Sequence, residues 1–159
     1  SGGAKVFNNL ISQHAKILTE GFNIINLTGD ARLNQLDKHI YRVDYITELY
    51  QPLMDFADVV VTRGGSNTLF ELIAMKKLHL VVPLGRQASR GDQIENALYA
   101  EKKGYSRQIS EEQFTVDTLL SEVEALLENK DFYIQNMEQS TEIQSVDSFY
   151  RLLMEDIGR

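Results

Sequence analysis

Residues 58–71 read Asp58-Val-Val-Val-Thr-Arg-Gly-Gly-Ser-Asn-Thr-Leu-Phe-Glu71, an order typical of a strand, a tight turn and a helix in an α/β protein. The β-branched run at 58–62 predicts a short strand that is covered on both faces, as strands of parallel sheets are. The two glycines break this strand, and helical spacing of apolar residues predicts a helix over 67–77. The unit predicted here is a strand, a glycine turn and a helix.

The same alternation extends along the chain in both directions. Strands are predicted at 22–27, 41–46, 78–83 and 105–109, and helices at 4–20, 49–56, 91–103 and 116–128. A polar, weakly helical stretch is predicted at 31–39, and a helical tail from 131 to 157. Alternating strands and helices predict an α/β fold, a doubly wound, mostly parallel sheet with helices on both faces. No repeat or linker interrupts the pattern, so residues 1–159 are predicted to form one domain.

The composition is that of a globular domain, with 43% hydrophobic and 25% charged residues in 159. The net charge of −7 disfavours non-specific contact with nucleic acid or anionic lipid. The absence of cysteine excludes disulfides and thiolate metal sites. No apolar run approaches the ~20 residues that span a bilayer. These features predict a cytoplasmic domain without a nucleic-acid partner or direct membrane contact.

The first predicted element is a helix, preceded by Ser1-Gly2-Gly3. In doubly wound folds a glycine-rich turn usually links the first strand to the first helix. The chain is therefore expected to begin just after its domain's first strand. A cloning remnant or a plain loop explains these residues equally well from the pattern alone.

Ligands of such sheets bind beyond the carboxyl ends of the strands, and residues 1–3, 62–71 and 89–97 are predicted there. Gly64 and Gly65 let the backbone approach a bulky ligand, and the helix start at Ser66 and Asn67 offers unpaired amides to a phosphate. Thr68-x-x-Glu71 matches a capping box, which is the interpretation favoured for Thr68. Glu71 could also accept two hydrogen bonds from a ribose.

The third segment carries Asp92, Gln93 and Asn96 on one helix turn. Such a polar lining suits a sugar with several hydroxyls, although residue counting alone favours a solvated helix start. Three arginines near these segments are either phosphate ligands or solvated: Arg63, Arg86 and Arg90.

Common enzyme signatures do not occur in the chain. It has no phosphate-binding lysine loop, G-x-G-x-x-G motif, metal-ligand histidine spacing, Asp-x-Asp pair or nucleophile elbow. We therefore expect a site without metal or cofactor that works by positioning and electrostatics.

Taken together and in order, these segments resemble the C-terminal donor-binding domain of the MurG-like N-acetylglucosaminyltransferases, two-domain enzymes of the GT-B fold. Ser1-Gly2-Gly3-Ala4, followed by Asn8, resembles the second half of the family's Gly-Gly-Ser-x-Gly-Ala loop. The run 57–71 resembles the family's strand, Arg-Ser-Gly-Ala-x-Thr loop and helix, and Asp92-Gln-x-x-Asn-Ala97 resembles its His-Gln-x-x-Asn-Ala segment. The resemblance covers nearly the whole chain.

The resemblance implies roles for individual residues. Ser1, Gly2 and Gly3 would face the diphosphate, Ile46 would lie at the uracil through its backbone, and Glu71 would hold the ribose hydroxyls. The residues implied to contact the phosphate and the N-acetylglucosamine are Thr68, Gln93 and Asn96. The turn residues implied beside the diphosphate are Gly64, Gly65, Ser66 and Asn67, with Asp92 next to them.

The resemblance also implies an activity: metal-independent, inverting transfer of N-acetylglucosamine from UDP-N-acetylglucosamine to the lipid-linked muramoyl-pentapeptide precursor of peptidoglycan. The amides and a helix dipole would stabilise the leaving UDP. The N-terminal domain, implied to bind the lipid acceptor at the inner face of the plasma membrane and to supply the catalytic base, is absent from this chain. No catalytic residue is therefore assigned, and the chain alone is expected to be inactive.

Two departures from the family pattern leave alternatives open. Gly64-Gly65-Ser66 replaces Ser-Gly-Ala, and Asp92 replaces His or Gln. A one-domain nucleotide-sugar-binding subunit of a split glycosyltransferase for polysaccharide or glycolipid remains an alternative. A UDP-sugar epimerase is disfavoured. The glycine loop of those enzymes usually reads Asp-Ser-Gly-Gly with paired glutamates, whereas Thr62-Arg63 precede the glycines here.

Overall fold

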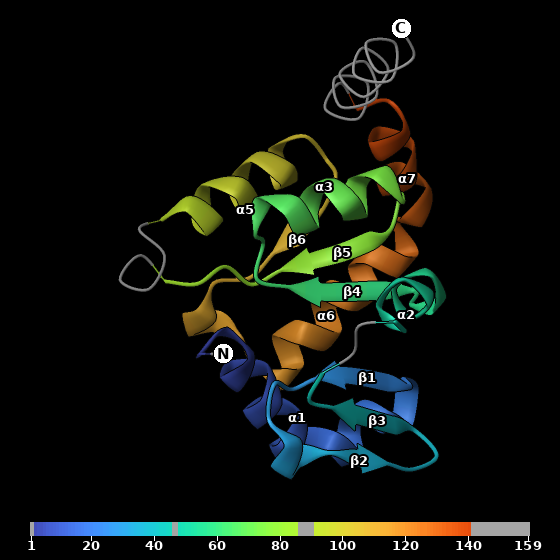
Figure 1. Cartoon of the computed structure of the whole chain (residues 1–159). Helices are drawn as coiled ribbons and strands as arrows, with labels where there is room; N and C mark the ends of the chain where they lie inside the picture. Colours follow the sequence, from blue (N-terminus) through green and yellow to red (C-terminus); the bar gives the residue numbers. More distant parts are fainter. Residues whose placement is uncertain (1, 46–47, 86–90, 141–159) are drawn as a thin grey trace, which may run out of the picture. The chain divides into compact units, whose positions relative to one another are not determined.

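The computed structural model describes residues 2–45, 48–85 and 91–140 of the chain (Figure 1). The fold divides into two compact units. The first comprises Ser1–Ala57 and Gln113–Ser121, and the second comprises Asp58–Glu112 and Glu122–Arg159. Helix α6 (Val116–Glu128) contributes residues to both.

The first unit contains a three-stranded sheet in the order β1-β3-β2. Its elements are α1 (Gly2–Gly21), β1 (Ile24–Leu27), η1 (Ala31–Leu33), β2 (Gln35–Leu36), β3 (Ile40–Val43) and α2 (Tyr50–Phe56). Strands β1 and β3 are parallel, with Ile24 opposite Ile40, whereas β2 is antiparallel to β3.

The predicted weak helix at 31–39 is wrong. Asp30 accepts a hydrogen bond from the Arg32 amide, and this cap starts only the single 3-10 turn of η1. The next residues pair with β3 as β2, so the strand ladder takes the backbone groups that a longer helix would have used.

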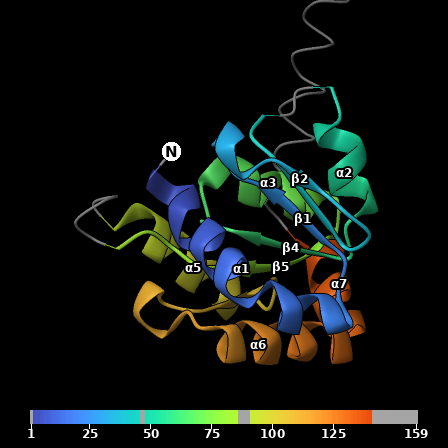
Figure 2. The same ribbon diagram turned by 90° about the horizontal axis from the view of Figure 1, so that it is seen from below.

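The apolar core of this unit lies between α1 and the start of α6. It is formed by Leu10, Ile11 and Leu18, with partly buried Ile24, Phe114, Val116, Leu119 and Leu120 packed against them. Each buried aliphatic side chain of this kind stabilises the fold by about 1.5–3 kcal/mol. Helix α1 contacts β1, as Figure 2 also shows.

A buried polar network joins α1 to β1 and β3. Arg42 is buried, with 6% of its surface exposed. Its Nε donates to Asn26 Oδ1 at 2.9 Å and its Nη2 donates to the Asn8 carbonyl at 3.0 Å. Asn8 Nδ2 in turn donates to the Thr28 carbonyl at 2.9 Å. Burial lowers the pKa of Arg42, because desolvation disfavours the charged guanidinium. The network fixes the first half of α1 against the carboxyl end of β1.

The second unit contains the sheet β4-β5-β6, in which both neighbouring pairs are parallel. Its elements are β4 (Val59–Thr62), α3 (Ser66–Ala74), β5 (Leu78–Val81), α5 (Asp92–Lys102), β6 (Arg107–Gln108) and α7 (Lys130–Glu138), with the second half of α6 and all of η2 (Glu111–Gln113) except Gln113. Val59 lies opposite Leu78, and Leu80 lies opposite Arg107. Helices α3 and α5 cover one face of this sheet and α7 covers the other (Figure 1).

The central strand β5 carries the core of the second unit. All four of its residues are buried, and the strand contacts α7. Leu80 on β5 is completely buried, and so are Leu72, Leu126 and Met137 from other elements of this unit. The predicted α/β class with parallel strands and flanking helices is confirmed.

Helix ends differ most from the predictions. The helix predicted to run to residue 77 ends at Ala74. Two residues later, Lys76 takes a left-handed conformation with φ of 55°, which does not continue a helix. The predicted tail helix begins as α7 and is observed to Glu138, while the rest of it, from residue 141, lies outside the described residues.

Candidate functional site

The turn after β4 requires glycine at position 64. Gly64 is buried with φ of +91°, and a Cβ atom there would lie 2.6 Å from Val81 Cγ1. Gly65 is extended (φ −60°, ψ 143°), and an added Cβ would meet no atom of the described residues within 4 Å. The first glycine therefore serves the fold, whereas the second leaves open space above the turn.

Helix α3 starts directly after this turn. Its first internal hydrogen bond runs from the Leu69 amide to the Gly65 carbonyl at 3.0 Å, so the amides of Ser66, Asn67 and Thr68 precede the helical ladder. Such amides, with the positive end of the helix dipole, attract anions. Glu71 lies one turn further on and is exposed.

The predicted capping box at Thr68 and Glu71 is wrong. Gly65 is the N-cap residue, and Thr68 lies inside the first turn of α3. The helix starts earlier than the sequence indicates because the extended Gly65 ends the turn. Neither side chain is then needed to cap the helix.

Two predicted residues of α5 reach the ends of β4 and β5. Asn96 Nδ2 donates to the Gly64 carbonyl at 3.2 Å, and Gln93 Oε1 accepts from the Leu84 amide at 2.9 Å. The structure thus brings the second and third predicted segments together at the carboxyl edge of the sheet. Asp92 is exposed at the start of α5, directly after the left-handed Gly91.

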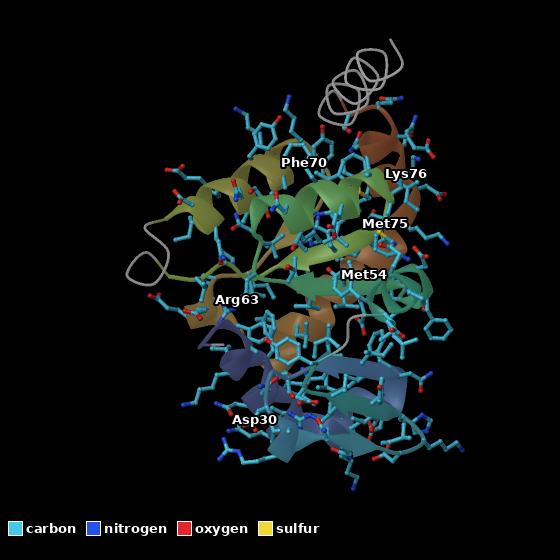
Figure 3. The ribbon with its side chains drawn as sticks, in the orientation of Figure 1. Asp30, Met54, Arg63, Phe70, Met75 and Lys76 are labelled. Atoms are coloured by element: carbon cyan, nitrogen blue, oxygen red, sulfur yellow. The ribbon has the colours of Figure 1, made fainter. Side chains whose placement is uncertain are left out.

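Arg63 is engaged within the protein. Its Nη1 donates to the Val82 carbonyl at 3.0 Å, and its Nη2 donates to Glu111 Oε1 at 2.7 Å. Figure 3 shows this side chain at the end of β4. The sequence left two interpretations of Arg63 open, a phosphate ligand or a solvated residue. Glu111 was not predicted, because it lies 48 positions away and belongs to no local motif.

The remaining predicted residues fall outside this cluster. Ser1 and Ile46, like Arg86 and Arg90, lie outside the described residues. Gly2 and Gly3 form the first turn of α1 in the other unit.

The described ranges lack both a metal-ligand cluster and a membrane-spanning helix. No group of three His, Asp or Glu side chains there is placed to hold a metal ion. None of the helices there combines the length and the apolar character needed to cross a bilayer.

Comparison with known proteins places these features in context. Residues 1–152 match the family model described as the glycosyltransferase family 28 C-terminal domain. Over all 159 residues the chain is 77% identical to a protein of Streptococcus suis named UDP-N-acetylglucosamine--N-acetylmuramyl-(pentapeptide) pyrophosphoryl-undecaprenol N-acetylglucosamine transferase. A Streptococcus uberis protein of the same name is 62% identical over 158 residues. The chain spans 45% and 44% of these two relatives.

Solved structures show the same fold at low sequence identity. The glycotransferase of kitacinnamycin matches with a TM-score of 0.59 and 18% identity, over 93% of this chain and 37% of that one. Glycosyltransferase VinC in complex with dTDP matches with a TM-score of 0.57 and 17% identity, over the same shares of 93% and 37%.

Proposed function

This chain belongs to the glycosyltransferase family 28 C-terminal domain family, and from that membership we propose that it is the donor-binding part of an N-acetylglucosaminyltransferase. The donor would be UDP-N-acetylglucosamine, and the acceptor the lipid-linked muramoyl-pentapeptide precursor of peptidoglycan. The names of the Streptococcus relatives support this assignment.

One geometric observation carries the proposal. The Gly64-Gly65 turn, the start of α3 and the α5 residues Gln93 and Asn96 meet at the carboxyl edge of a parallel sheet, the usual ligand position in such folds. Open space above Gly65 allows a diphosphate to approach the backbone.

Each group has a role in this proposal. The amides at Ser66, Asn67 and Thr68 stabilise the negative charge that develops on the leaving UDP. This stabilisation requires no metal ion. Glu71, exposed one helical turn later, accepts hydrogen bonds from the ribose hydroxyls. Gln93 and Asn96 contact the phosphate and the sugar through the side-chain amide atoms that their hydrogen bonds to the backbone do not use. These are Nε2 of Gln93 and Oδ1 of Asn96, and Asp92 lies beside them.

Other predicted contacts belong to the same proposal. The roles that the family resemblance implies for Ser1, Gly2 and Gly3 at the diphosphate and for the Ile46 backbone at the uracil stay predictions. The acceptor and the catalytic base belong to a further domain, which acts at the cytoplasmic face of the plasma membrane. This chain alone is expected to transfer no sugar.

Isothermal titration of the purified chain tests the proposal. UDP and UDP-N-acetylglucosamine should bind equally well without and with magnesium, and more tightly than UDP-glucose or GDP-mannose. Glu71→Ala should weaken UDP binding about tenfold or more, because a hydrogen bond to a charged group contributes about 1.5–3 kcal/mol.

The control is Glu124→Ala, which removes an exposed carboxylate from α6 and should leave binding unchanged. Binding of GDP-mannose alone would contradict the proposal. Failure of both this chain and the full-length protein to bind any uridine nucleotide would contradict it as well.

A further inference from the structure

Arg63 and Glu111 form an ion pair at the carboxyl edge of the sheet β4-β5-β6. Arg63 immediately follows β4, and Glu111 opens η2 after β6. The Arg63 side chain is only 12% exposed and that of Glu111 is 33% exposed. Because the Arg63 side of the pair is largely shielded from water, its charge interaction is screened less than that of a pair between two exposed side chains.

The same guanidinium also binds the end of the central strand. Its Nη1 donates to the Val82 carbonyl at 3.0 Å while its Nη2 holds Glu111 at 2.7 Å. One planar group therefore connects the segments that follow all three strands of the sheet. The planar fork of arginine offers two separate nitrogens to these two acceptors, whereas lysine has a single ammonium nitrogen.

Glu111 also reaches the loop that leads to α5. A Cβ atom added to Gly85 would lie 3.6 Å from the second oxygen of Glu111, Oε2, so the carboxylate is next to this glycine. Leu84, beside Gly85, donates its amide to Gln93. Arg63 directly precedes Gly64 in the chain, and the Gly64 carbonyl accepts a hydrogen bond from Asn96. The ion pair thus borders both halves of the candidate donor site.

We propose that Arg63 and Glu111 are positioning residues, which hold the Gly64-Gly65 turn and the Leu84-Gly85 segment in the arrangement that binds the donor. The inference rests on the donor-binding function proposed above. In this arrangement Arg63 acts through the two loops, and it does not contact the donor phosphates.

Neutralisation of Glu111 tests this role by the sign of its effect. If Glu111 acted only as a negative charge near an anionic donor, Glu111→Gln should tighten UDP binding. If it holds the loops through Arg63, the same change should weaken UDP binding about three- to tenfold. Arg63→Lys should weaken it by a similar factor although the positive charge is kept.

Glu112→Gln is the matched control. Glu112 is the next residue, is exposed, and forms no ion pair in the described part of the chain. Its neutralisation removes the same charge without touching the Arg63 pair, so UDP binding should stay equal to wild type or become slightly tighter.

Hydrogen exchange of the unliganded chain, followed by mass spectrometry, gives a second readout that requires no donor. Glu111→Gln and Arg63→Lys should speed amide exchange about fivefold or more in segments 62–68 and 82–85, and Glu112→Gln should not. Unchanged exchange, or tighter UDP binding by Glu111→Gln, would overturn the positioning role. If neither the wild-type chain nor the full-length protein binds UDP, the proposed function fails, and the exchange rates alone decide whether the pair orders the two loops.

Discussion

Asn96 on α5 donates a hydrogen bond from Nδ2 to the carbonyl oxygen of Gly64 at 3.2 Å, across 32 positions of sequence. This bond fixes a glycine whose left-handed conformation makes the turn after β4 possible. A residue predicted to contact a sugar therefore also shapes the loop predicted to contact a diphosphate. The sugar contact proposed for Asn96 and the geometry of the loop therefore depend on the same side chain.

Replacement of Asn96 by alanine should affect stability and binding together. The buried Gly64 carbonyl would lose its donor, which costs about 1–3 kcal/mol of unfolding free energy. UDP-N-acetylglucosamine should bind at least tenfold more weakly. Urea denaturation and calorimetric titration measure the two effects, and Asn9→Ala, at an exposed position of α1, serves as the control. An Asn96→Ala chain with wild-type stability would contradict the role in the loop.

Replacement by alanine should destabilise the chain far more at Gly64 than at Gly65. Gly64→Ala places a methyl group 2.6 Å from Val81 Cγ1 at a φ of +91°, so we expect a loss of about 2–4 kcal/mol. A Cβ at Gly65 would meet none of the described residues within 4 Å, so Gly65→Ala should change stability by less than about 1 kcal/mol. If a donor diphosphate approaches Gly65, that second variant should still weaken UDP binding. Thermal denaturation and titration of both variants separate the two effects.

Local patterns predicted the elements around this turn. Three successive valines at 59–61 predicted β4, and the paired glycines predicted the break before α3, because each signal lies within a few residues. The start of α3 was misplaced because Thr68 and Glu71 carry the spacing of a capping box. That spacing cannot reveal that Gly65 ends the turn two residues before the expected helix start.

Distant side-chain pairs were beyond local patterns. The Arg63 ion pair with Glu111 spans 48 positions, and Arg42 reaches Asn8 across 34. Nothing near either arginine in the sequence indicates its partner, because these contacts depend on which strands become neighbours. The sequence indicated which residue types line the edge of the sheet, and the fold determines which of them bind one another.

Substitution of Arg42 should destabilise the first unit strongly. Arg42→Met keeps the length of the side chain but leaves Asn26 Oδ1 and the Asn8 carbonyl without their donor, at an expected cost of about 2–4 kcal/mol. Arg32→Met removes an arginine side chain that is 89% exposed and should leave the denaturation midpoint unchanged. Urea unfolding followed by circular dichroism measures both. Equal midpoints for the two variants would show that the buried network contributes nothing.

His79 should make stability depend on pH below neutrality. The residue is fully buried on β5, its Nδ1 donates to the Lys77 carbonyl at 2.7 Å, and its Nε2 has no hydrogen-bond partner among the described residues. Desolvation lowers the pKa of this imidazole below its ordinary value of 6.5, so the folded chain keeps it neutral where the unfolded chain binds a proton.

The sign of the His79 effect follows from proton linkage. Above about pH 6.5 both states are neutral at this residue and its full contribution to stability is present. As the pH falls from about 6.5 towards the lowered pKa of the folded chain, the unfolded state gains protons and the free energy of unfolding decreases. The slope approaches about 1.4 kcal/mol per pH unit. His79→Leu should remove this component, so the difference between its urea-denaturation curve and that of wild type should vary between pH 7 and pH 5. A constant difference over that range would mean that His79 binds protons equally in both states and that its burial has no consequence for its charge.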